Sequence, residues 1–391
     1  MLTTGRADYG ILFPILTAIQ RDRDLELLLF VTGMHLSPEF GMSVREIECD
    51  GFAIDERVEI LISSDMPEGI VKSMGLAMIG FSQVFARRAP DIFLVVGDRF
   101  EVQAAVSACV PFSIPVAHVH GGEVTEGAID EVFRHSISKM SHLHFATTQT
   151  YANRIAQMGE EEWRIRVSGA PGLDNFLNMV VPSREQVEEA LSIDLEDRVL
   201  LATYHPPTRV LSGEDSGIDA LLEAIRELDM QVVFTYPNAD AGGRAIIAKI
   251  EEFKKSYAKI TVAINASQSI YIGLMKYAAA MVGNSSSGII EAASFGLPVV
   301  NVGPRQAGRI RARNVIDVLN EKTSLISALE KAVSAEFREE LEGLVNPYGD
   351  GRASETIVGT LKRVNIDSGL LRKKFADVEN SLSSSQRPGR G

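Results

Sequence analysis

Short apolar runs alternate along the chain with stretches of helical spacing, and this alternation is its strongest pattern. The first half contains the runs LELLLFVTG, DIFLVVGD and FSIPVAHVH, and the second half contains DRVLLATYH, MQVVFTYP, AAAMVGNSSSG and GLPVVNVG. Apolar, β-branched strands that alternate with helices are typical of parallel sheets covered on both faces. The pattern therefore predicts an α/β fold of two Rossmann-like, doubly wound domains that face a cleft.

The alternation of strands and helices begins again after MVVPSREQVEEAL, where a Pro-Ser pair interrupts an apolar run and a charged helix begins. This predicts an N-terminal domain at residues 1–181 and a C-terminal domain at residues 182–365. Residues 366–391 end in the polar sequence ENSLSSSQRPGRG, which is typical of a partly disordered tail. Only two residues precede the loop TTGRADYG, so the first strand is either short or begins upstream.

Composition and charge narrow the class of protein. The 391 residues suit two domains, and 45% hydrophobic with 23% charged residues is typical of a globular protein. A net charge of -13 argues against nucleic-acid binding, which needs a basic surface. Cys49 and Cys109 lie in no metal-ligand spacing, so we expect neither a metal nor a disulfide framework. We find no signal peptide and no apolar run near membrane length, which predicts a cytoplasmic protein without a membrane role.

Polar, charged and glycine residues gather in the loops that follow the predicted strands. These loops are TGRADYG, GDRFE, HVHGGE, TYHPPT, PNADAGGR, GNSSSG and GPRQAGR. In doubly wound sheets the ligand binds at the carboxyl ends of the strands. Glycine and aspartate also simply make turns, and for any single loop this is the commoner reason. Their recurrence in every loop on the same side of both sheets instead favours a ligand site.

The stretch MVGNSSSGIIEAASFGLPVV predicts a strand, a loop and a helix that bind an anion. Free N–H groups at the helix start, beside the hydroxyls of Ser285, Ser286 and Ser287, can hold a phosphate. Gly288 is expected to let the backbone approach the ligand, and Glu291, one turn on, can accept hydrogen bonds from a ribose. An ordinary serine N-cap accounts for the same residues equally well.

Basic residues elsewhere supply the positive charge that a phosphate ligand needs in an acidic chain. Arg305, Arg309 and Arg311 follow the next strand, and arginine presents forked donors suited to phosphate. With Arg6 and His205 they are expected to form a positive cluster, which indicates a nucleotide diphosphate. Neither a G-x-x-x-x-G-K-[ST] loop nor a G-x-G-x-x-G after a strand is present, so we expect neither a P-loop NTPase nor a dinucleotide cofactor.

The stretch HVHGGEVTEGAIDEVFRHSISKMSHLH holds five of the seven histidines. As a helix, its second part would pack one stripe on the sheet, made of Ile129, Phe133, Ile137 and Met140. Asp130 and Arg134, four apart at the edge of this stripe, could form a half-sheltered pair that tunes an acid or base. A plain helix-face ion pair is the alternative, and we prefer it for Glu131 with His135.

Further titratable residues surround this helix in the sequence. Asp98 ends its strand at GDR and is expected to point a second carboxylate at the same cleft. His120 and Glu123 flank a Gly-Gly pair, which we expect to let a sugar approach. His142 and His144 lie beyond the helix, and we interpret them as structural. The stretch is therefore predicted to form an acid/base wall.

The motifs TGRADYG, GDRFE, HGGEVTEGAIDEVFRHSISKMSHLHF, SGAPGLDN, TYHPPT, GNSSSGIIEA and GPRQAGR together resemble the hydrolysing UDP-N-acetylglucosamine 2-epimerases of sialic-acid biosynthesis. The likeness covers about residues 3–358. It implies the GT-B architecture, a homodimer or tetramer, no cofactor, and conversion of UDP-GlcNAc and water to N-acetylmannosamine and UDP. The implied route is elimination of UDP to a glycal, followed by addition of water, which needs two positioned proton carriers and stabilisation of the leaving diphosphate.

Residue patterns and resemblance together define the candidate site, with the roles of base and acid left open. The catalytic candidates are Asp98, His120, Glu123, Asp130, Arg134 and His205. The substrate-binding candidates are Arg6, Arg99, Asn238, Ser285, Ser286, Ser287, Gly288, Glu291 and Arg305.

One position departs from the sialic-acid pattern. Those members read His-x-Glu-Gly-Gly-Glu and use the first glutamate in catalysis, whereas this chain reads HVHGGE with His120 in that place. Histidine can do acid/base work near neutral pH. The motif resembles the branch that makes legionaminic-type sugars from UDP-2,4-diacetamido-2,4,6-trideoxyglucose, so the C4 and C6 groups of the sugar stay open. Less favoured alternatives are a UDP-dependent GT-B glycosyltransferase, a non-hydrolysing epimerase and a non-catalytic nucleotide-sugar sensor.

Overall fold

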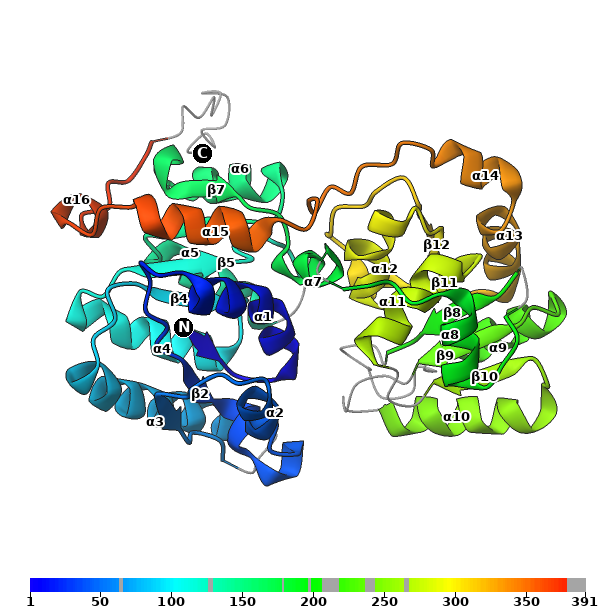
Figure 1. Ribbon diagram of the computed structural model, residues 1–391, viewed down its shortest axis with the longest axis horizontal. Coiled ribbons are helices and arrows are strands. Elements are labelled where there is room, and N and C mark those ends of the chain that lie inside the picture. Colours follow the sequence, from blue (N-terminus) through cyan, green and yellow to red (C-terminus); the bar gives the residue numbers. More distant parts are fainter. Residues whose placement is uncertain are drawn as a thin grey trace, which may run out of the picture.

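The structure is a computed structural model, and it describes residues 1–62, 66–125, 129–177, 179–195, 198–205, 218–235, 243–263 and 267–377. Two α/β halves lie side by side along the long axis of the molecule (Figure 1).

Parallel strands form the centre of the first half. They are β1 (Leu2–Thr3), β2 (Phe30–Thr32), β3 (Glu56–Val58), β4 (Phe93–Val96), β5 (Val116–Val119), β6 (Leu143–Ala146) and β7 (Ile165–Val167). Hydrogen-bonded ladders run in the orders β1-β2-β3 and β4-β5-β6-β7, and β1 also contacts β4. The strand order therefore reverses between β1 and β4, the point at which doubly wound sheets open a ligand site.

Helices cover both faces of this sheet. They are α1 (Arg6–Arg21), α2 (Val44–Cys49), α3 (Pro67–Arg87), α4 (Phe100–Phe112), α5 (Ile129–Met140), α6 (Gln149–Gln157) and α7 (Asp174–Leu177). Leu12 and Leu94 belong to the core on one face, and Phe81 and Phe93 to the core on the other. Burial on both faces explains why the strands read as continuous apolar runs.

The second half repeats this architecture with the strands β8 (Leu200–Thr203), β9 (Val232–Thr235), β10 (Ile260–Ala263), β11 (Ala280–Gly283), β12 (Val299–Val302) and β13 (Val315–Val318). All of its strand pairs are parallel, in the order β10-β9-β8-β11-β12-β13. At the reversal between β8 and β11, a Cβ on Gly283 would lie 1.9 Å from the carbonyl oxygen of Thr203, so only glycine fits. The predicted pair of doubly wound domains is confirmed.

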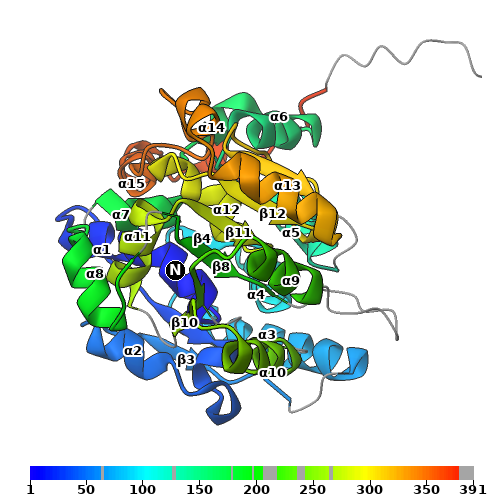
Figure 2. The ribbon, with the colours of Figure 1, turned by 90° about the vertical axis from the view of Figure 1, so that its right-hand side faces the viewer.

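The helices of the second half are α8 (Arg184–Leu191), α9 (Ile218–Glu227), α10 (Gly243–Ser256), α11 (Gln268–Tyr277), α12 (Ser286–Ile290), α13 (Lys322–Ala332) and α14 (Ala335–Glu340). One core cluster joins the sheet to α9, α10 and α13, and another joins it to α8 and α11 (Figure 2). At the predicted start of this half, Ser183 accepts a hydrogen bond from the backbone N–H of Gln186 and caps α8.

The chain then returns to the first half through α15 (Ala353–Arg363) and α16 (Ser368–Leu371), as the orange and red ribbons show (Figure 1). Helix α15 contacts α1, and its Ile357 shares a core cluster with Leu12. Asp174 accepts the backbone N–H of Ala353 at 2.9 Å and so caps α15. The sequence had grouped α15 with the second domain, which was predicted to reach residue 365, but these contacts place it on the first half.

Part of the predicted tail is packed against the first half. Arg164, whose side chain is 1% exposed, donates hydrogen bonds to the carbonyls of Leu370 at 2.8 Å and Gly369 at 3.0 Å. The backbone N–H of Ala376 donates to the carbonyl of Gly159 at 2.9 Å. Residues 366–377 therefore belong to the fold, and the rest of the predicted tail lies outside the described residues.

Helix α3 corrects the expectation that no apolar run is long enough to cross a membrane. Within the described ranges it is the one helix that meets this test by length and composition. The core helix of a globular domain can pass the same test. Ala77, Phe81 and Phe85 of α3 are buried in the core.

Candidate functional site

Residues from both halves meet where the carboxyl ends of the two sheets approach each other. In the first half Asp98 follows β4 and His120 follows β5; in the second half Glu291 lies beyond β11, just after α12. Burial raises the pKa of the Glu291 carboxyl, while a hydrogen bond with Ser287 and the charges of Arg309 and His120 oppose the rise. The charge of His120 thus acts on Glu291 of the other half, and the hydroxyl of Tyr151 accepts the backbone N–H of Ile310 at 3.2 Å, so residues of the two halves lie close together here.

Arg134 is the buried centre of the acidic residues, with a side chain that is 7% exposed. Its guanidinium donates hydrogen bonds to Asp98, to Glu131 at 3.1 Å and to Thr125 at 2.9 Å. The sequence predicted that Arg134 pairs with Asp130, one turn away on α5. Instead the guanidinium reaches the carboxylate at the end of β4, because tertiary packing brings that strand end against α5. Arg134 thus fixes Asp98 in place.

Helix α5 meets the sheet one turn later than predicted. Ile137 is fully buried and Phe133 and Met140 pack on the core, but Ile129 is 60% exposed. The expected pair between His135 and Glu131 does form, at 3.0 Å.

Asp130 occupies a different environment from Asp98, although both are aspartates of the same site. Burial raises the pKa of Asp130, and the carboxylate of Asp98 raises it further, while Arg99 and Arg134 offset only part of the rise. A carboxyl group with a raised pKa keeps its proton to higher pH. The carboxyl group of Asp130 therefore holds its proton more tightly than an ordinary aspartate does.

His120 and Glu123 form a tight pair across the turn after β5. The Nδ1 atom of His120 lies 2.7 Å from Oε1 of Glu123, which also accepts the hydroxyl of Thr147 at 3.0 Å. Burial alone would raise the pKa of Glu123, but the charge of His120 and its hydrogen bond outweigh burial and lower it to about 2. Glu123 is thus a carboxylate that can only accept hydrogen bonds.

The Gly-Gly pair packs against protein instead of opening the loop to a sugar. A Cβ on Gly121 would lie 2.9 Å from Oγ of Ser138 and 3.0 Å from Nδ1 of His118. Gly122 has a φ of +74°, and its Cβ would lie 2.4 Å from the carbonyl oxygen of Tyr151. The glycines allow close packing behind the loop, which corrects their predicted role.

His118 is a site residue that the sequence did not single out. Its ring is fully buried, with Nε2 at 2.7 Å from the carbonyl of Gly97 and Nδ1 at 3.1 Å from the hydroxyl of Ser138. Burial lowers its pKa to about 3, so the ring is neutral and donates from Nε2 to the carbonyl. His118 therefore ties the residue before Asp98 to α5. Its place in the histidine-rich stretch was the available signal.

In the second half the serines form a cap at a helix of five residues, α12. The side chain of Ser285 accepts the N–H of Ser287 at 3.3 Å, which is the ordinary N-cap that the sequence left as an alternative. Ser286 and Ser287 are half-buried. Gly288 faces the sheet, where a Cβ would meet Val299 at 2.9 Å, so it serves helix packing and not the approach of a ligand.

Asn284, directly after β11, holds two of the predicted phosphate-binding residues. Its side chain accepts the backbone N–H of His205 at 2.7 Å and donates to the carbonyl of His205 at 2.9 Å. Its own carbonyl accepts the guanidinium of Arg305 at 3.1 Å. Asn284 is 3% exposed and was not among the candidates, although it stands in the GNSSSG motif.

Carboxylates bind several of the arginines that the sequence analysis placed in the positive cluster or in the substrate-binding set. Arg6 pairs with Glu46, and both side chains are largely exposed. Arg99 donates to the buried Glu101 at 2.9 Å.

Arg311 is likewise engaged, because it donates to Asp317 of β13 at 2.6 Å. The charge of Arg309, by contrast, acts on both Glu123 and Glu291. Asn238 lies outside the described residues. Within the described ranges, no group of three His, Cys, Asp or Glu side chains is arranged to hold a metal.

Comparisons with known proteins agree on one family. The model of the family described as UDP-N-acetylglucosamine 2-epimerase matches residues 17–362. A GDP/UDP-N,N'-diacetylbacillosamine 2-epimerase (hydrolyzing) of Campylobacter jejuni is 40% identical over 97% of this chain and 98% of that protein. A UDP-N,N'-diacetylbacillosamine 2-epimerase (hydrolyzing) of Legionella pneumophila is 35% identical over 95% and 97%.

Solved structures support the fold. A UDP-GlcNAc 2-epimerase from Neisseria meningitidis bound to UDP-GlcNAc superimposes with a TM-score of 0.73, 21% identity, and coverage of 93% of this chain and 99% of that chain. A 2-epimerase structure from Listeria monocytogenes gives a TM-score of 0.76, 20% identity, and coverage of 92% and 94%.

Proposed function

This chain belongs to the UDP-N-acetylglucosamine 2-epimerase family and is a hydrolysing UDP-sugar 2-epimerase, and from that premise we propose that its substrate is UDP-2,4-diacetamido-2,4,6-trideoxyglucose, also called UDP-N,N'-diacetylbacillosamine. The observation that carries the proposal is His120 in the loop HVHGGE, where the sialic-acid pattern has a glutamate. The relatives that match at 40% and 35% identity bear the name of this sugar, which supports the same choice.

The proposed reaction has two stages. A base removes the proton from C2, the C–H electron pair forms the C1–C2 double bond, and the C1–O bond breaks so that UDP leaves with its electrons. Water then adds its oxygen to C1 and loses one proton, while the electron pair of the C1–C2 double bond takes up a proton at C2 on the opposite face, which gives the free 2-epimer. The chemistry needs a base, an acid and positive charge near the diphosphate.

The first half supplies the groups that handle protons. We assign this work to Asp98, His120 and Asp130, and Arg134 holds Asp98 while Glu123 holds His120.

We assign the nucleotide mainly to residues of the second half, joined by Arg6 and Arg99 of the first half. The proposed binding set is Arg6, Arg99, Asn238, His205, Ser285, Ser286, Ser287, Glu291 and Arg305. Of these, Glu291 is suited to the ribose, because its Oε2 is buried without a hydrogen-bond partner among the described residues. Gly288 is better explained by packing.

The assembly and location of the protein are also proposals. We expect a cytoplasmic homodimer or tetramer. Exposed apolar side chains on α3 support self-association, among them Val71 at 67%, Leu76 at 44% and Ile79 at 60% exposure. Light scattering that gives the mass of one chain would contradict this expectation.

The proposed substrate is tested directly by NMR in heavy water without any acceptor. The protein is incubated separately with the UDP-linked trideoxy sugar, its GDP-linked form and UDP-GlcNAc, and free nucleotide and sugar are followed. We expect the fastest release of UDP, with deuterium at C2 of the 2-epimer, from the UDP-linked trideoxy sugar. Faster turnover of UDP-GlcNAc or of the GDP form would replace the proposed substrate. Nucleotide release that requires an added acceptor would instead indicate a glycosyltransferase.

A further inference from the structure

The side chains of His120 and Glu123 form a buried pair whose geometry indicates what each residue does. Their side chains are 11% and 6% exposed, and Nδ1 lies 2.7 Å from the carboxylate oxygen. The hydroxyl of Thr147, which follows β6, holds the same oxygen at 3.0 Å. Glu123 is therefore fixed from two sides before any ligand arrives.

We propose that Glu123 is a positioning residue that keeps the imidazole of His120 protonated on Nδ1, so that Nε2 removes the C2 proton of the substrate. The inference rests on the proposed function, and it decides a question that the sequence left open, namely which group is the base. Glu123 itself does not touch the substrate.

The tautomer follows from the hydrogen-bond inventory. A carboxylate accepts and cannot donate, so the proton between His120 and Glu123 belongs to Nδ1. The Nε2 atom is buried and has no hydrogen-bond partner among the described residues. A neutral ring with its proton on Nδ1 presents a lone pair at Nε2, which is the form that a general base requires.

The backbone conformation of His120 supports its place in an active site. Its φ is +67°, a left-handed conformation that few residues other than glycine adopt. Such strain persists where the surroundings impose it and is concentrated at active sites. Gly121 and Gly122, which follow His120, pack closely against Ser138 and Tyr151 behind the loop.

The charges around His120 come from several elements. Glu123 lies on the same loop, Glu291 follows α12 of the second half, and His118 lies on β5. Arg309 and Arg134 act in turn on Glu123. One carboxylate in direct contact thus stabilises the imidazolium that forms when Nε2 takes the proton.

The Nε2 lone pair bonds the C2 proton, the C–H pair becomes the C1–C2 double bond, and the C1–O pair leaves with UDP. His120 is then an imidazolium held by Glu123, and it returns its proton to solvent after UDP leaves. Protonation of C2 in the second stage falls to another group, for which the raised pKa of Asp130 is suited.

The decisive variant is Glu123→Gln. An amide can donate to Nδ1 and so favours the opposite tautomer, with the proton on Nε2, where the ring cannot act as a base. We expect UDP release to fall about 10³-fold or more, as for a catalytic histidine whose tautomer is inverted. Hydration of the free glycal supplied as substrate, which bypasses the first stage, should stay within about fivefold, since a single hydrogen bond is the only other loss.

The matched control is Glu160→Gln, which makes the same change in a second buried histidine–glutamate pair, that of His144. Its folded fraction should release UDP at the rate of the unaltered protein. Equal loss of both stages in Glu123→Gln, or unchanged UDP release, would overturn the inference.

A spectroscopic measurement covers the case in which Glu123→Gln does not fold. In the unaltered protein with 15N-labelled histidine, the His120 ring should show a protonated Nδ1 and an unprotonated Nε2 near pH 7.5. The opposite tautomer would overturn the inference even if the enzyme turns over. If the unaltered protein releases no nucleotide from any of the three sugars, the proposed function is refuted. The tautomer of His120 can still be measured in that case, so the two failures are distinguishable.

Discussion

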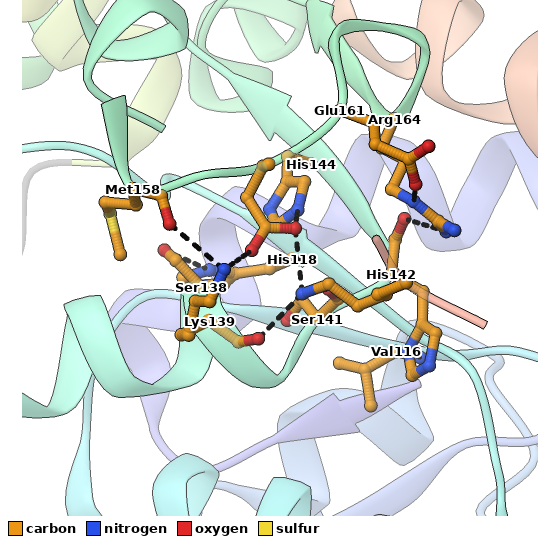
Figure 3. Close-up of polar contacts among 12 residues, drawn as sticks. Val116, His118, Ser138, Lys139, Ser141, His142, His144, Met158, Glu161 and Arg164 are labelled. Atoms are coloured by element: carbon orange, nitrogen blue, oxygen red, sulfur yellow. Dashed lines mark hydrogen bonds and ion pairs between the residues drawn. The ribbon is translucent and has the colours of Figure 1, made fainter. Parts of the chain in front are cut away.

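The described residues of the first half contain two buried histidine–glutamate pairs, and these pairs have different surroundings. His120 and Glu123 stand 2.7 Å apart at the site, and His144 and Glu160 stand 3.0 Å apart where α5 meets the end of α6. Glu160 also binds Lys139 and Lys373, each at 2.8 Å. Figure 3 shows Lys139 and His144 gathered beside Met158, close to Arg164 and Glu161.

Both pairs contain a ring nitrogen without a partner among the described residues, namely Nδ1 of His144 and Nε2 of His120. What distinguishes the two pairs is therefore the charged groups around each carboxylate. Burial alone would raise the pKa of Glu160, but hydrogen bonds from His144, Lys139 and Lys373 outweigh it and lower the pKa to about 2. Burial also lowers the pKa of His144, so it stays neutral.

Lys373 lies beyond α16 and also donates to the carbonyl of Ser141 at 2.6 Å. This second pair therefore fastens the chain end to the first half, which supports the prediction that His144 is structural. His142 agrees, since its Nδ1 accepts the backbone N–H of Val116 at 3.2 Å (Figure 3). The two pairs therefore differ in what binds the carboxylate: two lysines bind Glu160, whereas the hydroxyl of Thr147 binds Glu123.

Replacing each histidine by alanine should separate the two pairs most strongly. His120→Ala should lower kcat/KM about 10³-fold, because a general base contributes about 10² to 10⁴. His144→Ala should leave kcat of the folded protein within twofold and lower its melting temperature. Steady-state UDP release and thermal unfolding of both variants provide the check, and a large loss of kcat in His144→Ala would abolish the distinction.

Glu160→Gln should be the more destabilising of the two glutamate variants. It removes a fully buried carboxylate that serves three cationic or polar partners, and breaking a buried pair costs about 3 kcal/mol of unfolding free energy. Urea denaturation of Glu160→Gln and Glu123→Gln measures the order. Equal stabilities would mean that the lysines do not stabilise the carboxylate as proposed.

Acid should weaken the structural pair in a defined window. The pKa of Glu160 falls from 4.5 to about 2 in the folded state, so its contribution is complete above pH 4.5 and is lost as the pH falls from 4.5 towards 2. Up to about 3 kcal/mol of unfolding free energy is at stake. Denaturation midpoints at pH 6, 4.5 and 3 measure the loss, and Glu160→Gln should show a correspondingly flatter dependence. Parallel curves for the two proteins would rule out Glu160 as the source.

Thr147→Val should have the smallest effect, confined to the site. The change keeps the volume and removes one hydrogen bond to Glu123, which is worth about 1 kcal/mol and so about a fivefold fall in kcat. Thr360→Val on α15 is the matched control, since among the described residues its hydroxyl bonds only the carbonyl of Thr356. If Thr147→Val behaves like the control, Thr147 plays no part in holding Glu123.

Much of the site could be predicted because strand ends and loops are local features of the chain. Asp98 and His120 directly follow apolar runs, so the rule that ligands meet the carboxyl ends of strands placed them at the site. The pair of Glu131 with His135 also followed from helical spacing alone. The partner of Arg134 could not be predicted in this way. Two carboxylates compete for its guanidinium, that of Asp130 four residues away and that of Asp98 36 residues away.

The two doubly wound domains can be predicted from the amino-acid sequence alone, because the periodic burial of each segment is visible in its own residues. Contacts between distant segments form only when the finished elements pack together. Asn284 holds His205 from 79 residues away, α15 returns to α1, and the charges of Glu291 and His120 meet between the halves. Such contacts depend on how finished elements pack against one another, and hydrophobic periodicity carries no record of which elements become neighbours.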